Sequence, residues 1–223
     1  MDDLNMFVKT ITNTCPGSGE GYGSIVDCDV VFDDMGLPYI PARRIKGVLR
    51  ECALELQEMV NNSGLMEIQD HQLNKVFGRE GQYEGASLIV TDLLIDGHDG
   101  YKEWFEWLYH KYPALFSPAV MMEYFTEMRR QTSITEQGIA EEGSLRTSRV
   151  LKKGLCFKGL LYLSDYDEKD IVLLALSCAN LRHLGVQRNR GLGEVEVMLY
   201  KGNDNVTKLA LQKLGAKGGK SSA

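Results

Sequence analysis

Apolar residues recur along the chain with two periods, and these periods divide it into predicted strands and helices. Segments in which every second residue is apolar are typical of strands, and segments in which apolar residues recur every three or four positions are typical of amphipathic helices. The pattern predicts strands over 4–12, 87–95, 154–163 and 194–201 and helices over 43–61 and 167–184. Their order along the chain is βαββαβ, which is that of an α+β, ferredoxin-like (RRM-like) fold.

Two long segments interrupt this core and are expected to be insertions. The first covers about 14–41, and the second, about 97–153, is predicted to contain a helical lid followed by a long, thumb-like hairpin. The aromatic residues of the lid are interpreted as core residues rather than as a platform on which bases stack. The expected bounds are 101–130 for the two helices of the lid and 131–134 and 144–151 for the arms of the hairpin. We therefore expect a single domain over 1–201, followed by a C-terminal tail over 202–223 that is at least partly disordered because its end is of low complexity.

Composition and charge narrow the possible partners. The chain has 223 residues, of which 43% are hydrophobic and 25% charged, as is usual for a globular protein. No apolar run approaches the ~18 residues that a membrane span requires, and the first residues are acidic where a signal peptide would be basic, so we expect a cytoplasmic protein. The net charge of −6 argues against a protein that coats nucleic acid with its whole surface, but it permits a local basic groove. Lysine and arginine gather at 43–50, 129–130, 146–153 and 182–190.

The stretch 36–50, GLPYIPARRIKGVLR, joins an extended segment to a predicted helix and places charge at the joint. Its two prolines disfavour helix before them, so Arg43, Arg44 and Lys46 fall on the first turn of the helix. A helix start already carries partial positive charge and unpaired N–H groups, so three cations there favour an anionic ligand such as a phosphate. A solvated basic turn is the alternative interpretation.

A glycine- and arginine-containing loop, GVQRNRGLG at 185–193, precedes the last predicted strand. Gly191 and Gly193 allow the backbone to approach an extended ligand, and Arg188 and Arg190 offer bidentate phosphate donors. In a βαββαβ core this loop can lie close to the loop before the first helix, which would place both basic groups at one groove. The alternative is a tight turn with two exposed arginines.

Four short stretches, taken in order, form a more specific pattern. They are GLPYIPARRIKGVLR at 36–50, VFG at 76–78, QTSITEQGIAEEGSLRTSRVLKKGLCF at 131–157 and QRNRGLGEVEV at 187–197. Together they resemble the motifs of the RAMP superfamily of CRISPR-associated proteins, particularly the repeated backbone subunit of type III interference complexes. The chain departs from that pattern where Ala42, Arg43 and Arg44 replace Gly-Ser-Ser, and where Thr135 replaces an acid or amide. The segment 144–154 is also similar to the cap-like subunit of type III-D complexes.

The resemblance implies a subunit that grips guide RNA and stacks with copies of itself or with paralogues into a helical assembly. Target RNA would be a further partner, and no membrane is implied. The hairpin near 131–149 would be the thumb that inserts between nucleotides and contacts the neighbouring subunit. The residues that the basic clusters and the resemblance assign to RNA binding are Arg43, Arg44, Lys46, Arg50, Arg129, Arg130, Thr132, Arg146, Arg149, Arg188, Arg190, Gly191 and Gly193.

The resemblance also implies a candidate for catalysis. In the cleaving backbone subunits of the family, an aspartate in the loop before the isoleucine-proline-glycine motif cuts target RNA with a divalent metal. Asp27 has nearly that spacing before Pro38, which implies that Asp27 is the catalytic residue and a ligand of Mg²⁺ or Mn²⁺. Asp27 and Asp29 are alternatively polar residues on the exposed side of an edge strand. The chain is thus expected to be a metal-dependent endoribonuclease within a complex, a non-catalytic cap or scaffold subunit without a cofactor, or a ferredoxin-like regulatory domain that binds a small ligand.

Overall fold

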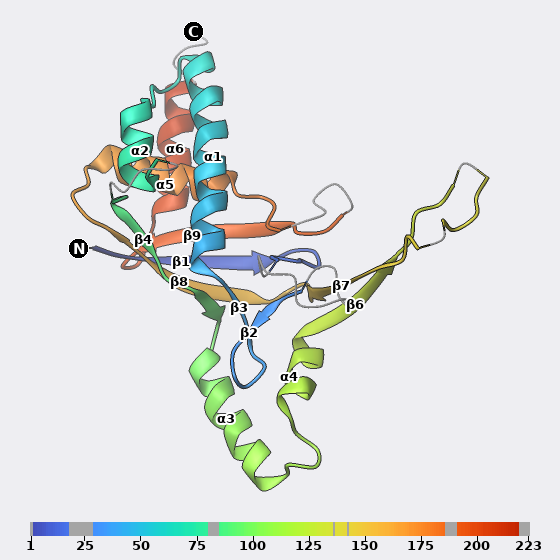
Figure 1. The fold of residues 1–223 in the computed structure, drawn as a ribbon. Coiled ribbons are helices and arrows are strands. Elements are labelled where there is room, and N and C mark those ends of the chain that lie inside the picture. The colour runs from blue at the N-terminus through green and yellow to red at the C-terminus, as the bar shows by residue number, and fades with distance from the viewer. Residues whose placement is uncertain are drawn as a thin grey trace.

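The computed structural model is built around a sheet of eight strands (Figure 1). The strand order is β10-β9-β1-β8-β5-β3-β2, and β4 also pairs with β8. The structure describes residues 2–17, 29–79, 85–135, 137–141, 143–185 and 191–218. The strands of the sheet are β1 (Asp2–Thr10), β2 (Val31–Phe32), β3 (Pro38–Ile40), β4 (Leu88–Val90), β5 (Leu93–Ile95), β8 (Cys156–Leu163), β9 (Val195–Lys201) and β10 (Asp204–Asn205).

Helices supply the second layer and a separate lid. The described helices are α1 (Ala42–Ser63), α2 (Asp70–Phe77), α3 (His98–Lys111), α4 (Pro118–Phe125), α5 (Glu168–Asn180) and α6 (Val206–Gly218). In Figure 1, α1, α2, α5 and α6 lie above the sheet, whereas α3 and α4 lie below it. No helix in the described ranges has both the length and the apolar character needed to cross a bilayer.

The core has ferredoxin-like topology, as the sequence predicts. The elements β1, α1, β4 with β5, β8, α5 and β9 follow one another along the chain. In the sheet the last core strand, β9, lies beside β1, and β1 lies beside β8, which in turn pairs with β4 and β5. All of these pairings are antiparallel. The α+β, ferredoxin-like prediction is therefore confirmed.

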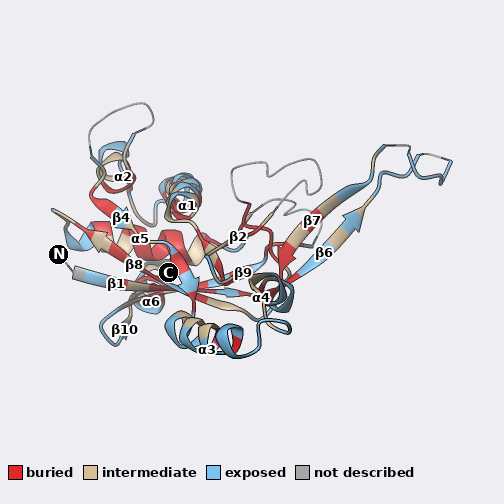
Figure 2. Ribbon diagram, turned by 60° about the horizontal axis from the view of Figure 1, so that its bottom comes forward, coloured by how far each residue is buried: buried red, intermediate tan, exposed pale blue. Residues whose placement is uncertain are grey.

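The hydrophobic core lies between the sheet and the helices above it. Alternate residues of β1, Leu4, Met6 and Val8, are buried against the helices, so the intervening residues of that strand point to the other face. The helix α1 buries one face that includes Ile45 and Leu49. Its C-terminus is closed by Gly64, a residue in the left-handed region. Figure 2 shows these buried segments within the body and the exposed hairpin projecting from it.

Two predicted boundaries are wrong, one in a core strand and one in the second insertion. The strand expected over 87–95 is divided into β4 and β5, because the hydroxyl of Thr91 accepts the Leu160 N–H at 2.9 Å and interrupts the ladder. The second lid helix, expected to continue to residue 130, ends at Phe125. The polar run after it forms β6 (Thr126–Gln131), which pairs in register with β7 (Arg146–Leu151). The hairpin is therefore longer at its base than its sequence suggests, and Arg129 and Arg130 lie on a strand.

The expected C-terminal tail is largely an ordered part of the domain. Residues 204–218 form β10 and α6, and α6 packs on α5 and β9. Val206, Ala210 and Leu214 recur every four residues and face the core, which explains why this segment forms a helix. The Thr207 hydroxyl accepts the N–H of Leu199 in β9 at 2.9 Å. The boundary at residue 201 is therefore wrong, and of the expected tail only 219–223 lies outside the described residues.

Candidate nucleic-acid interface

The basic start of α1 is held by an acid from the sheet. Pro41 precedes the helix and offers no side-chain cap, and the first turn contains no acidic residue. The carboxylate of Asp92, at the break between β4 and β5, accepts the N–H of Ala42 at 2.7 Å. One of the unpaired N–H groups of the helix is thus satisfied internally. Of the three cationic side chains of the first turn, only that of Arg43 is exposed.

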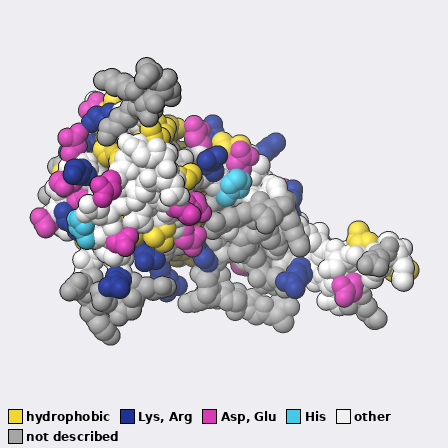
Figure 3. All heavy atoms as spheres, turned by 90° about the horizontal axis from the view of Figure 1, so that it is seen from above, with side chains coloured by type: hydrophobic (Ala, Val, Ile, Leu, Met, Phe, Trp, Pro, Cys, Tyr) yellow, Lys and Arg dark blue, Asp and Glu magenta, His cyan; other side chains and the backbone are white. Residues whose placement is uncertain are grey.

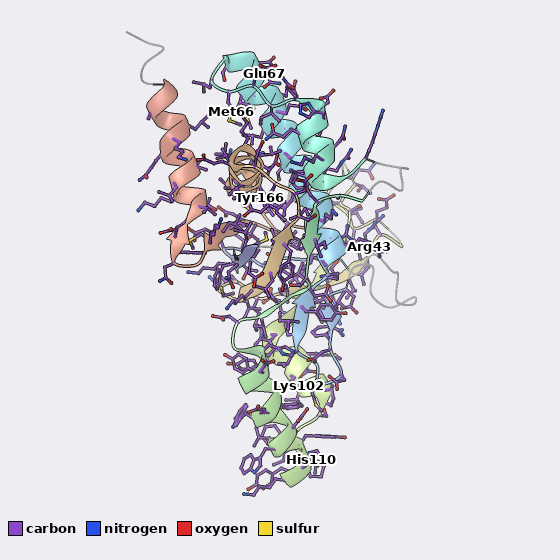
Figure 4. The ribbon with its side chains drawn as sticks, turned by 90° about the vertical axis from the view of Figure 1, so that its left-hand side faces the viewer. Arg43, Met66, Glu67, Lys102, His110 and Tyr166 are labelled. Atoms are coloured by element: carbon purple, nitrogen blue, oxygen red, sulfur yellow. The ribbon has the colours of Figure 1, made fainter. Side chains whose placement is uncertain are left out.

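Arg43 and Arg44 lie beside a small cavity at this helix start. Arg43 is exposed, and Figure 4 places it at the end of α1 that lies nearest the sheet. A Cβ atom on Gly17 would lie 2.9 Å from Nη2 of Arg44, so glycine at position 17 allows the guanidinium to lie against the backbone. The cavity, of about 190 Å³, is also lined by Gly47 and Glu51. The two arginines are therefore positioned together, as the sequence predicts.

The other two cations of α1 have different surroundings. The ammonium group of Lys46 donates to the Leu88 carbonyl of β4 at 2.7 Å, and burial lowers the pKa of Lys46. Arg50 is half-buried, and its Nε has no hydrogen-bond partner among the described atoms. Lys46 therefore ties α1 to the sheet, and its predicted contact with RNA stays a prediction. The helical face of the molecule seen in Figure 3 carries basic and acidic side chains intermixed, which is typical of a solvated surface.

The hairpin β6–β7 carries two arginines on each of its faces. In its register Arg129 lies opposite Ser148 and Arg130 opposite Thr147, while Arg146 lies opposite Gln131 and Arg149 opposite Met128. Side chains alternate between the faces of a strand, so Arg129 and Arg146 share one face, and Arg130 and Arg149 share the other. Each pair is diagonal across the two strands. Arg130 and Arg146 are exposed and form no ion pair with any residue in the described part of the chain.

The far end of the hairpin is exposed and partly apolar. The hydroxyl groups of Thr132 and Ser144 lie 2.7 Å apart and join the two arms beyond the last register pair. Three large apolar side chains of this end, Ile134, Ile139 and Leu145, are 65–70% exposed. Apolar side chains on a projecting hairpin favour contact with another molecule. These three residues are absent from the predicted RNA-binding set, although apolar residues in a largely polar hairpin are a signal visible in the sequence.

The base of the hairpin is joined to the segment before β2 by an ion pair. Nη1 of Arg149 lies 3.2 Å from each carboxylate oxygen of Asp29. The guanidinium also lies over the ring of Phe32, 5.8 Å from its centre. Asp29 accepts the N–H of Val30 at 2.7 Å as well. Its carboxylate is therefore occupied within the protein.

Asn13, just after β1, connects three parts of this region. Its side-chain amide donates to the carboxylate of Glu127 on β6, and its side-chain oxygen accepts the N–H of Lys153 at 3.0 Å. Its backbone carbonyl accepts the N–H of Gly193 at 2.9 Å. Asn13 thus fixes the hairpin base beside the glycine-containing loop. No local sequence motif indicates these contacts, because the partners are remote in the chain.

The two glycines of that loop have different roles. Gly193 has φ of +82°, and a Cβ atom there would lie 2.4 Å from the Leu184 carbonyl, so the close approach is to the protein's own backbone. Gly191 has φ of +72° and open space where a Cβ atom would be. Only Gly191 is therefore placed to let a ligand approach. Arg188 and Arg190 lie outside the described residues.

The proposed catalytic aspartate, Asp27, also lies outside the described residues. Its neighbour Asp29 is paired with Arg149 and does not offer a free carboxylate to a metal. Among the residues that the structure describes, no three His, Cys, Asp or Glu side chains come together as potential metal ligands. The assignment of Asp27 as a catalytic residue and a ligand of Mg²⁺ or Mn²⁺ stays a prediction.

The aromatic residues of the lid are only partly core residues. Phe105 is fully buried, but Trp104 and Trp107 on the same helix are 56% and 54% exposed. The ammonium group of Lys111 lies 4.6 Å from the centre of the Trp107 ring. The sequence interpretation of these tryptophans as core residues is wrong, because the helix α3 projects away from the sheet (Figure 1) and buries only Phe105 and Leu108.

Comparisons with known proteins agree with this architecture. The model of the RAMP superfamily matches residues 7–196. The chain is similar to a chain in the cryo-EM structure of the Type III-B Cmr-beta bound to cognate target RNA, with a TM-score of 0.64, 14% identity, and coverage of 89% of this chain and 97% of that chain. For a chain in the apo state of the Type III-B Cmr-beta, the TM-score is 0.65 and the identity 15%, with coverage of 90% and 98%. No curated protein matches the chain.

Proposed function

Because the chain belongs to the RAMP superfamily, we propose that it binds guide RNA as a subunit of a type III CRISPR ribonucleoprotein effector used in antiviral defence. The observation that carries this proposal is the projecting hairpin with two arginines on each face. Its fold is shared with chains of the Type III-B Cmr-beta, one of whose structures contains cognate target RNA. Target RNA and other subunits of the same family are the proposed further partners.

The hairpin would contact RNA on both of its sides. A strand of RNA that the hairpin passes through presents phosphates above and below it. Arg129 and Arg146 would contact phosphates on one side, and Arg130 would contact them on the other. Arg149 is held by Asp29, so it would position the hairpin base as well as add charge. The base is anchored before RNA arrives, which lowers the entropy lost on binding.

The start of α1 would supply the second phosphate contact. Arg43 and Arg44 lie beside a concave surface, and the glycine at position 17 allows the Arg44 guanidinium to lie there. The helix dipole adds to the attraction for an anion there. Together with Gly191, this surface would hold the guide on the body of the subunit while the hairpin separates its nucleotides. A non-catalytic scaffold or cap subunit uses the same contacts.

Cleavage of target RNA is a separate proposal that rests on Asp27. Asp29 is the other acid in this segment, and its carboxylate is already paired with Arg149. Acid-dependent chemistry from this segment would therefore rest on Asp27. A bound Mg²⁺ or Mn²⁺ would supply charge stabilisation at the phosphate and activation of a nucleophile.

A salt series tests the binding function. We expect the Arg130→Ala, Arg146→Ala double variant, which removes one exposed arginine from each face of the hairpin, to bind single-stranded RNA more weakly than the wild type. Each lost phosphate contact lowers the magnitude of the slope of log K against log salt by about 0.7, so the slope is expected to change by about 1.4. Fluorescence anisotropy at several salt concentrations measures both quantities.

The matched control is the Lys169→Ala, Lys208→Ala double variant, which removes two exposed cations from α5 and α6. This variant lowers the net charge by as much as the hairpin variant, but both of its lysines lie on the helical face. Its slope of log K against log salt should therefore match that of the wild type. Equal slopes for the wild type and the hairpin variant would rule out the proposed contacts.

A further inference from the structure

The sheet has an open face whose chemistry differs from that of the hairpin. The odd-numbered residues of β1 point away from the helices, and Asn5, Phe7 and Lys9 line a cavity of about 470 Å³ on this face. The neighbouring strands add side chains that include Lys158 from β8 and Tyr200 from β9. Figure 2, in which the underside of the sheet comes forward, shows the intermediate and exposed segments of these strands. None of these residues belongs to the basic surface described above.

An aromatic platform lies at the centre of this cavity. Phe7 lies opposite Met198 on one side and Lys158 on the other, so it occupies the middle of three paired strands. The ring of Tyr200 meets the ring of Phe7 edge to face, with centres 5.6 Å apart and planes at 86°. This contact fixes the orientation of the Phe7 ring. A fixed, half-exposed ring on a flat sheet is suited to stacking with a planar ligand.

The charges around the platform favour an anionic ligand. The cavity contains two lysines, Lys9 and Lys158, against one glutamate, Glu196, on a chain with a net charge of −6. Within the described ranges, neither lysine forms an ion pair. The ammonium group of Lys158 lies 5.6 Å from the centre of the Phe7 ring. An exposed contact of this kind is weaker than the stacking of a base on an aromatic ring, so a base can displace the ammonium group toward a phosphate.

The side-chain amide of Asn5 supplies a polar group near the Phe7 ring, where it can recognise the edge of a stacked base. Asn5 lies opposite Tyr200, and no described residue forms a hydrogen bond with its side-chain amide. An amide offers both donors and an acceptor to the edge of a base. We propose that the open face of the sheet is a second site for single-stranded RNA, where a base stacks on Phe7, Asn5 contacts its edge, and Lys158 and Lys9 contact the flanking phosphates. This site extends the proposed function to a second RNA segment outside the hairpin and α1 surface.

The test uses a short photoreactive RNA and two variants. Phe7→Leu keeps an apolar side chain and removes the aromatic face, and Lys158→Glu reverses an exposed charge. Loss of one base–aromatic stack is expected to weaken binding about 5-fold or more, and Lys158→Glu is expected to reduce the salt dependence as well. Phe7→Trp should restore the affinity. Crosslinking of 4-thiouridine RNA followed by mass spectrometry should identify peptides of β1, β8 or β9.

Controls separate this proposal from the main function and from other ligands. Lys169→Glu makes the same charge change on the helical face and should bind RNA like the wild type. The two platform variants, Phe7→Leu and Lys158→Glu, are also measured in the Arg130→Ala, Arg146→Ala background. Their effect on RNA affinity should persist there if the two sites are separate. If the Arg130→Ala, Arg146→Ala variant bound RNA like the wild type while crosslinks to β1 persisted, only the hairpin contacts would be excluded. The two proposals can therefore fail independently.

Three outcomes would overturn the second site. Crosslinks confined to other peptides, with unchanged affinity for both platform variants, would exclude RNA from this face. Binding of AMP that RNA does not compete would identify a site for free nucleotides instead. A change in particle mass for Phe7→Leu by light scattering, with unchanged RNA affinity, would identify a protein interface.

Discussion

Asp29 and Arg149 form the contact that holds the hairpin base against the segment before β2. Their side chains are 17% and 28% exposed, so the pair is only partly screened by solvent. We expect Asp29→Asn, which can still accept the Val30 N–H, to lower the free energy of unfolding by about 1 kcal/mol. Urea unfolding of this variant, of Arg149→Met and of the double variant gives the coupling energy between the two residues. A coupling energy of zero would mean that the pair does not anchor the hairpin.

Lys75 and Asp170 join α2 to the start of α5. The Lys75 ammonium group donates to Asp170 at 2.9 Å, and this hydrogen bond raises the pKa of Lys75 above its ordinary value of 10.5. The folded state therefore holds this proton more tightly than the unfolded state. The resulting stabilisation is fully present below pH 10.5 and is lost as the pH rises through the folded-state pKa.

We accordingly expect the free energy of unfolding of the wild type to fall more steeply above about pH 10.5 than that of Lys75→Met. Urea unfolding across this range measures the difference. Lys169→Met, which removes an exposed lysine from α5, should follow the wild-type curve. Parallel curves for the wild type and Lys75→Met would contradict the assigned proton linkage.

Individual contacts of the interface were predictable only where the chain makes them locally. The prolines and the charges of one stretch were enough to place Arg43 and Arg44 on the first turn of α1. The cap that Asp92 provides was not predictable, because the acid comes from a different strand and no local period marks it. The hydrogen bond from Lys46 to the Leu88 carbonyl was not predictable for the same reason, because Leu88 lies in β4.

At the scale of elements, strong periodicity predicted the core and weak periodicity failed at the insertions. The alternation in β1, β8 and β9 and the apolar face of α1 gave the correct types in the correct order. The run TEMRRQ that forms β6 is polar and adjoins a helix, so its pattern does not distinguish a strand from another helical turn. This run forms a strand because it pairs with β7. The apolar period of Val206, Ala210 and Leu214 in α6 directly precedes the low-complexity end of the chain, which obscures it.

The hairpin can be shortened without disturbing its paired base. Gln131 and Arg146 are register partners, so replacing residues 132–145 by Asn-Gly closes β6 and β7 with a two-residue turn. We expect this variant to unfold at the same urea concentration as the wild type, because the excised side chains that the structure describes are exposed, apart from half-buried Ser144, whose hydrogen-bond partners are excised with it. It should fail to form RNA-dependent oligomers, measured by light scattering with single-stranded RNA. Oligomers of wild-type size would show that the excised part does not mediate assembly.

At the scale of the whole molecule, binding and cleavage are expected to be separable. Affinity would rest on arginines of the hairpin and α1, so Asp27→Ala in the assembled complex should abolish metal-dependent cutting of guide-matched RNA and leave RNA affinity nearly unchanged. Denaturing gels with and without EDTA measure the cutting. Asp29→Asn is the matched control and should retain cutting, because Asp29 is paired with Arg149. Undiminished cutting by Asp27→Ala would refute the assignment.

The position of β1 in the sheet has a consequence for the order in which the chain can fold. Leu4 is paired on one side with Leu161 and on the other with Lys201, so the first strand of this domain has both of its partners far along the chain. Contacts between residues so distant in sequence form slowly, whereas the β6–β7 hairpin is local and can form early. During synthesis β1 therefore remains an unpaired strand until β8 has emerged. A nascent chain of this topology depends on protection of that exposed edge during synthesis.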